Sequence, residues 1–214
     1  MPRYRVLHTE RIKEPAVYLC RHSDLQGILM TVPWLPVRVR IWALAVFCDV
    51  EASYRHLQEI TFIGRYRWPR WFATVAARLA SYGLAALLHS GRVIPVFRGS
   101  PRIRQTFRLS TDALKRGESL LIFPDKDYVE ADSDVSDLYK GFLRLDVLYH
   151  RATGQHIPFI PLYGDRRRHT LTVYEPLRFS NSAEDEAETS RMLSLLKARL
   201  SGHGGPLEAH SRRG

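Results

Sequence analysis

The sequence predicts an α/β fold: a single domain in which a mixed, mostly parallel sheet is flanked by helices. Short apolar runs of strand length alternate along the chain with segments of helical period, and this alternation is typical of α/β proteins. The 214-residue chain is 45% hydrophobic and 11% aromatic, which excludes a disordered chain and suffices to bury one core. We therefore expect one domain over residues 1–202, followed by a flexible basic tail over 203–214.

Six apolar runs have the length and composition of strands. In chain order they are AVYLC (16–20), WALAVF (42–47), RVIPVF (92–97), SLLIF (119–123), HIPFIPLY (156–163) and TLTVYE (170–175). In α/β folds, function is expected where strands run into loops. The residues that follow these runs are therefore the first candidates for a site.

The longest apolar stretch covers residues 71–88 and is interrupted by Arg78. It is shorter than the roughly 20 residues that a spanning helix usually needs, so it predicts a core or interfacial helix. The segment before it, YRWPRW, places Trp68 and Trp71 among arginines. Such a mixture suits a lipid headgroup layer, but it is equally compatible with an ordinary surface that contains a few buried tryptophans.

Three later segments also predict helices. Residues 100–117 carry an apolar stripe and end at Gly117, and residues 132–154 carry apolar residues at helical spacing and end at Gly154. The clearest helix lies within 181–202, where Asn181 or Ser182 is expected to form the cap. Acidic residues near its start and basic residues near its end match the helix dipole.

Cysteine usage and charge narrow the functional classes. The two cysteines, Cys20 and Cys48, follow no secretory signal, so we expect free thiols in a reducing, cytoplasmic compartment. Cys20 is expected to be buried within a strand. The formal net charge of +10 indicates an anionic partner: a phospholipid surface, a nucleic acid or a phosphorylated substrate. The histidines show no convincing metal-ligand spacing, and we expect no metal.

Polar residues follow the strand-like runs in four blocks. The first, CRHSDLQG, contains His22 and Asp24, which form either a general base with its orienting partner or a polar turn. The second, IPVFRG, ends in Arg98 and Gly99, where glycine permits close backbone approach and arginine offers a forked donor to phosphate. The third is FPDKDY, and the fourth is IPFIPLYG, whose paired prolines are most typical of an edge strand or bulge.

The order of these blocks resembles the phospholipid/glycerol acyltransferase family, which includes the lysophosphatidic acid acyltransferases. The first block stands in place of the motif Asn-His-x-Ser-x-x-Asp, and the second matches a strand followed by Arg-Gly. The third stands in place of Phe-Pro-Glu-Gly-Thr-Arg, with YKGFLRL as the Lys-Gly element downstream, and the fourth matches the strand with paired prolines. The resemblance covers residues 14–175 and implies a glycerolphosphate-acyltransferase-like fold.

The resemblance implies an enzyme of phospholipid biosynthesis that transfers a fatty acyl group from an acyl thioester to a hydroxyl. The donor is acyl-CoA or acyl carrier protein, acting as a co-substrate rather than a bound cofactor, and the acceptor is a lysophospholipid or a glycerol phosphate-type alcohol. His22 takes the place of the family's general base, and Arg98 that of its phosphate-contacting arginine, with Gly99 beside it. Asp125 takes the place of the family's glutamate, and Lys126 replaces its glycine.

The sequence departs from the family at the partner of the base. The family's aspartate lies five residues after the histidine, where this chain has Gly27, and Asp24 is the nearest carboxylate. Three other carboxylates are candidates for the partner of His22 if the fold brings them close to it: Asp49, Asp125 and Asp127. In the third block, Lys126 either supplies the cation that the absent Thr-Arg pair would provide or belongs to a loop rebuilt for another acceptor.

The spacing between the first two blocks is a further departure. His22 and Arg98 are 76 positions apart, more than the resemblance leads us to expect, and the excess is rich in aromatic residues and arginine. We expect this insertion either to shape an acyl tunnel or to dock on the bilayer. We expect a peripheral protein on the anionic inner face of the membrane, and no nucleic-acid partner. The alternatives are a non-catalytic relative that binds lipid or acyl chains and, from charge alone, a nucleic-acid-binding protein.

Overall fold

The computed structural model describes residues 4–8, 12–21, 32, 34–35, 37–87, 93–124, 138–165, 167–181 and 184–202. Within these ranges the chain is an α/β protein with seven strands, whose pairings are mostly parallel, as the sequence predicts. The chain divides into two compact units, Met1–Arg38 with Ala113–Gly214 (unit 1) and Val39–Asp112 (unit 2). The single-domain boundary at residue 202 stays a prediction, and the tail over 203–214 lies outside the described residues.

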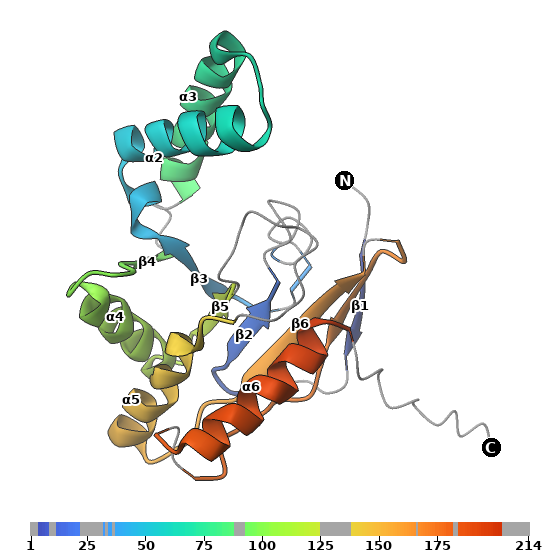
Figure 1. Cartoon of the computed structure of the whole chain (residues 1–214). Helices are drawn as coiled ribbons and strands as arrows, with labels where there is room; N and C mark the ends of the chain where they lie inside the picture. The colour runs from blue at the N-terminus through green and yellow to red at the C-terminus, as the bar shows by residue number, and fades with distance from the viewer. Residues whose placement is uncertain are drawn as a thin grey trace. The chain divides into compact units, whose positions relative to one another are not determined.

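Unit 1 contains five strands in the order β1-β7-β6-β2-β5 (Figure 1). They are β1 (Arg5–His8), β2 (Val17–Cys20), β5 (Ser119–Ile122), β6 (Phe159–Asp165) and β7 (Thr170–Val173). β2 pairs in parallel with both β5 and β6, and β1 pairs in parallel with β7. β7 runs antiparallel to β6, because a connection of a few residues permits only a hairpin.

β6 lies between β2 and β7, so the expectation that its prolines mark an edge strand or bulge is wrong. Pro161 pairs with Leu19 of β2, and its carbonyl accepts a hydrogen bond from Tyr174 N at 3.1 Å on the β7 side. The nitrogen and carbonyl of one strand residue point to the same neighbour, so the missing N–H also faces β7. The β6–β7 ladder begins only at Leu162, and the proline therefore leaves the pairing with β2 intact.

The core of unit 1 forms where buried strands meet helices. All four residues of β2 and of β5 are buried, and α6 (Glu186–Leu200) packs on β6 (Figure 1). Helix α6 buries Met192, Leu196 and Leu200, which recur every fourth residue and so share one face. Asp185 caps the helix by accepting from Ala187 N at 2.9 Å, so the predicted caps at residues 181 and 182 are wrong.

The predicted helix over 132–154 is shorter than its apolar pattern suggested. A 3₁₀ turn, η4 (Lys140–Leu143), leads into α5 (Arg144–Thr153), and Leu138 lies ahead of both. The predicted end is right: Gly154 has φ 75°, in the left-handed region that glycine tolerates, and donates to His150 O at 2.8 Å.

Unit 2 contains the parallel pair β3 (Val39–Leu44) and β4 (Val93–Val96) and a helical excursion between them. The predicted strand over 42–47 was placed too late, because β3 ends at Leu44 and a 3₁₀ turn, η1 (Ala45–Cys48), follows. The excursion continues through α2 (Val50–His56), a π-helical segment η2 (Leu57–Arg65) and α3 (Arg70–Leu87). Helix α4 (Ile103–Lys115) follows β4, and its last turn belongs to unit 1. No described helix is both long and apolar enough to cross a membrane.

Small residues let the helices of unit 2 pack closely. Ala73 and Ala77 of α3 are fully buried against Phe62 of η2, and Trp68 stacks on the Phe62 ring at 4.8 Å. Helix α4 is tied to the strands by side-chain hydrogen bonds: the Trp42 indole donates to Ser110 Oγ at 2.9 Å. The predicted helix at 71–88 is thus present as α3.

Candidate functional site

The predicted catalytic blocks follow two neighbouring strands of unit 1. β2 and β5 run parallel and in register, with Leu19 opposite Ile122. The last described residues after each strand, Arg21 and Pro124, therefore leave the sheet at the same edge, which we call the carboxyl edge. The chain continues from these two residues into the first and third blocks.

Five candidate residues of these blocks, His22, Asp24, Asp125, Lys126 and Asp127, lie outside the described residues. Their roles stay predictions. Cys20, the last residue of β2, is buried and is not part of a disulfide, as the sequence predicts.

Arg98 and Gly99 lie in unit 2, between the carboxyl end of β4 and the start of α4. Gly99 has φ 67°, and a Cβ added there would meet nothing within 4 Å, so backbone conformation alone requires glycine. The Arg98 Nε is buried, and Ser100 Oγ accepts from Arg102 N at 3.3 Å at the start of the helix. The first turn of α4 contains no acidic residue, so the positive end of its dipole is not neutralised from within that turn.

Asp49, one of the candidate partners of the base, forms a structural hydrogen bond at the start of a helix. Its side chain accepts from Ala52 N at 2.7 Å and caps α2. A carboxylate at a helix N-terminus is stabilised by the backbone donor and by the dipole. This engagement disfavours Asp49 as the partner of His22.

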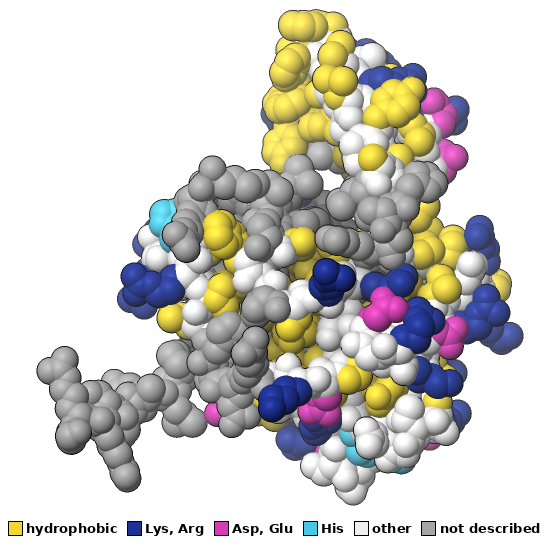
Figure 2. All heavy atoms as spheres, turned by 180° about the vertical axis from the view of Figure 1, so that it is seen from behind, with side chains coloured by type: hydrophobic (Ala, Val, Ile, Leu, Met, Phe, Trp, Pro, Cys, Tyr) yellow, Lys and Arg dark blue, Asp and Glu magenta, His cyan; other side chains and the backbone are white. Residues whose placement is uncertain are grey.

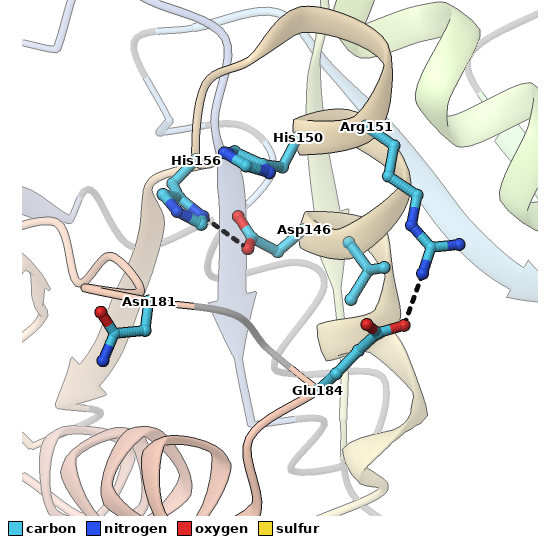
Figure 3. Close-up of a pocket in the computed structure, with 7 residues that line it drawn as sticks. Asp146, His150, Arg151, His156, Asn181 and Glu184 are labelled. Atoms are coloured by element: carbon cyan, nitrogen blue, oxygen red, sulfur yellow. Dashed lines mark hydrogen bonds and ion pairs between the residues drawn. The ribbon is translucent and has the colours of Figure 1, made fainter.

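The structure brings together an Asp–His pair that the sequence analysis did not predict. Asp146 of α5 is 1% exposed, and its Oδ2 lies 2.8 Å from Nδ1 of His156, in the segment before β6 (Figure 3). Its Oδ1 accepts from Ile157 N at 2.8 Å. The pair lines a pocket of about 370 Å³, whose lining residues are Asp146, Val147, His150, Arg151, His156, Asn181 and Glu184.

The chemistry of this pocket follows from the carboxylate. A carboxylate accepts hydrogen bonds, so His156 donates from Nδ1; in the neutral ring Nε2 is then the acceptor, which is the tautomer of a general base. The His150 ring stacks on His156 at 4.3 Å between centroids. Arg151 and Glu184 form an ion pair at 2.6 Å across the rim (Figure 3). The described residues that line the pocket include no hydroxyl or thiol for such a base to activate.

The pocket lies at the opposite edge of the sheet from the carboxyl edge. His156 precedes Phe159, which pairs with Val17 at the start of β2, whereas the predicted catalytic block follows the end of β2. We therefore interpret the Asp146–His156 pair as structural: it fixes the segment before β6 to α5, and we call it the brace. One sequence signal points to it: Gly154 ends α5 in the left-handed conformation, so the chain turns there before it reaches His156.

The described fold defines the class: an α/β protein in which polar blocks follow the carboxyl ends of parallel strands. Compared with protein-family models, with curated proteins and with solved structures, the chain has no match.

Proposed function

We propose that the protein is an acyltransferase that moves a fatty acyl group from an acyl thioester to a hydroxyl of a lysophospholipid or glycerol phosphate-type acceptor. One observation carries the proposal: the blocks that resemble the first and third motifs of the acyltransferase family follow β2 and β5, which are parallel neighbours in register. Strand ends at one edge of a parallel sheet are where α/β proteins bind ligands.

In the proposed reaction, His22 acts as the general base. It removes the hydroxyl proton of the acceptor as the oxygen attacks the thioester carbonyl, and the thiolate leaves when the tetrahedral intermediate collapses. The imidazolium then returns the proton to the departing sulfur, so charge and protons balance. No acyl-enzyme is needed, in keeping with the burial of Cys20 within β2.

The proposed phosphate contact is the Arg98-Gly99 pair. A guanidinium offers parallel donors to phosphate oxygens, and glycine at positive φ turns the backbone where no other residue turns it without strain. The adjacent amino end of α4, with no acid in its first turn, adds a favourable potential for an anion.

Thiol release from acyl-CoA, measured with a panel of lysophospholipid and glycerol phosphate acceptors, tests the base. His22→Ala is expected to lower kcat roughly a hundredfold to ten-thousandfold. His169→Asn, a change at an exposed histidine with φ 50°, is the matched control and should leave the rate unchanged. Full activity in His22→Ala would refute the assignment, and vesicle binding without turnover on any donor or acceptor would favour the non-catalytic relative.

Two further comparisons test the partner of the base and the phosphate contact. Asp24→Asn and Asp125→Asn, assayed in parallel, identify the carboxylate that orients His22, since only its neutralisation should lower kcat. Arg98→Lys is expected to raise KM about tenfold for phosphorylated acceptors and not for a monoacylglycerol, because lysine cannot bind bidentately. Arg104→Lys, at an exposed position of α4, serves as its control.

A further inference from the structure

One side of α3 presents large apolar side chains to solvent. Trp71 is 73% exposed, Val75 56%, Leu79 70% and Tyr82 60%, and their spacing of three to four residues puts them on one stripe of the helix. The opposite side carries the small buried residues that pack on η2. α3 is therefore amphipathic in an unusual sense, because its large apolar residues face outward.

The stripe continues on its neighbours. Phe72 of α3, Ile60 of η2 and Tyr66, which follows η2, are also exposed. Figure 2 shows hydrophobic side chains gathered over these helices at the top of the view, with basic side chains beside them. Soluble proteins rarely leave so many large apolar residues contiguous and uncovered, and such a patch marks an interaction surface.

The charge of unit 2 indicates the partner. Residues 39–112 contain eleven arginines and four acidic residues, a net +7 of the chain's +10. Two of the acids pair within the helices: Glu51 with Arg78, and Glu59 with Arg70, each at 3.1 Å. Most of the protein's excess positive charge thus lies in the unit that exposes the apolar stripe.

We infer that α3 lies in the interface of an anionic phospholipid bilayer, with its outward stripe (Trp71, Val75, Leu79 and Tyr82) at the boundary between headgroups and acyl chains. Indole and phenol rings suit this boundary, valine and leucine gain from the acyl layer, and arginines bind headgroup phosphates. A second copy of the chain is a poorer partner, because a symmetric contact would bring two units of like charge together. Aliphatic side chains gain nothing from the backbone of a nucleic acid. This inference goes beyond the proposed acyl transfer and does not depend on it.

Vesicle flotation tests the inference. The full chain is mixed with vesicles of phosphatidylcholine and phosphatidylglycerol, and Leu79→Ser and Trp71→Ser are each expected to weaken binding about tenfold, from the loss of a buried apolar side chain. Leu7→Ser, at the exposed apolar position of β1, is the matched control and should stay within twofold of wild type. Binding should be weaker to phosphatidylcholine alone and should fall as salt is raised.

Tryptophan fluorescence reports the depth of the stripe. Brominated phospholipids are expected to quench the bound protein, and Trp71→Phe should abolish most of that quenching. Of the other three tryptophans, Trp42 is buried, Trp68 is stacked within unit 2, and Trp34 is half-buried beside Tyr4 in unit 1. Quenching that persists in Trp71→Phe would overturn the placement of α3.

Three outcomes would overturn the inference: unchanged vesicle binding in Leu79→Ser and Trp71→Ser, an equal loss in Leu7→Ser, or a dimer in sedimentation that Leu79→Ser dissociates while vesicles are not bound. Two measurements distinguish a failure of this inference from a failure of the proposed acyl transfer. His22→Ala should bind vesicles like wild type, and Leu79→Ser should keep its turnover of short-chain, water-soluble substrates.

Discussion

Removal of the Asp146 carboxylate tests the brace before β6. In Asp146→Ala, the N–H of Ile157, which is fully buried, loses its acceptor at a cost of about 1–3 kcal/mol. The His156 bond adds only about 0.5–1.5 kcal/mol, because that ring is 24% exposed and water can replace the partner. The expected loss of unfolding free energy is therefore about 1.5–4.5 kcal/mol, and it should lie toward the lower value because the cost of burying a carboxylate also disappears.

The matched variant is Asp146→Asn. Its amide oxygen still accepts from Ile157 N, and its NH₂ can donate to His156 Nδ1 once the ring changes tautomer, so we expect a loss of less than about 1 kcal/mol. Urea unfolding followed by circular dichroism, with unchanged m-values, measures both changes. A double-mutant cycle with His156→Ala should give a coupling of about 0.5–1.5 kcal/mol.

Two results would refute this reasoning. A loss below about 0.5 kcal/mol in Asp146→Ala would mean that the pair does not support the fold. A loss in Asp146→Asn equal to that in Asp146→Ala would mean that charge, rather than the acceptor, is what matters. In addition, loss of acyl transfer in a folded Asp146→Asn protein would contradict the placement of this pair away from the catalytic edge.

Two further predictions concern a turn and a pH dependence. Gly99→Ala should lower the free energy of unfolding by about 1 kcal/mol because φ at this position is 67°. Gly83→Ala, in α3, should raise it by about 0.5–1 kcal/mol, because an added Cβ meets nothing within 4 Å there and alanine favours the helix. An equal effect of the two substitutions would contradict the role assigned to φ. The hydrogen bond from Arg191 lowers the pKa of Glu188 from 4.5 to about 2, so its contribution to stability is complete above pH 4.5 and is lost as pH falls toward 2. The difference in melting temperature between wild type and Glu188→Gln should accordingly be constant above pH 5 and shrink below it; a constant difference down to pH 2 would refute the shift.

The apolar runs predicted five of the described strands and the α/β class, because buried parallel strands read as continuous apolar sequence. Two strands, β1 and β3, did not follow this pattern. β1 was missed because Arg5 and Leu7 are exposed at an edge, so its four residues carry no buried run. The run at 42–47 was misplaced because a 3₁₀ turn over 45–48 is as apolar as the strand before it.

For the candidate site, the sequence by itself determined which residues follow the strands and in what order, and that order carries the resemblance to acyltransferases. Only the tertiary structure decided that β2 and β5 are neighbours, because strand order depends on pairing between distant segments. It likewise assigned Asp49 to a helix cap and paired His156 with Asp146.

The two tryptophans of YRWPRW show the division most simply. Both lie beside arginines in the sequence, which is compatible with a lipid-facing surface and with buried tryptophans. The packing of α3 on η2 distinguishes the two residues: Trp68 stacks on Phe62, and Trp71 is exposed. The sequence determines how apolar each residue is. Which side of a helix is covered depends on the element that packs against it, and that is a property of the folded chain.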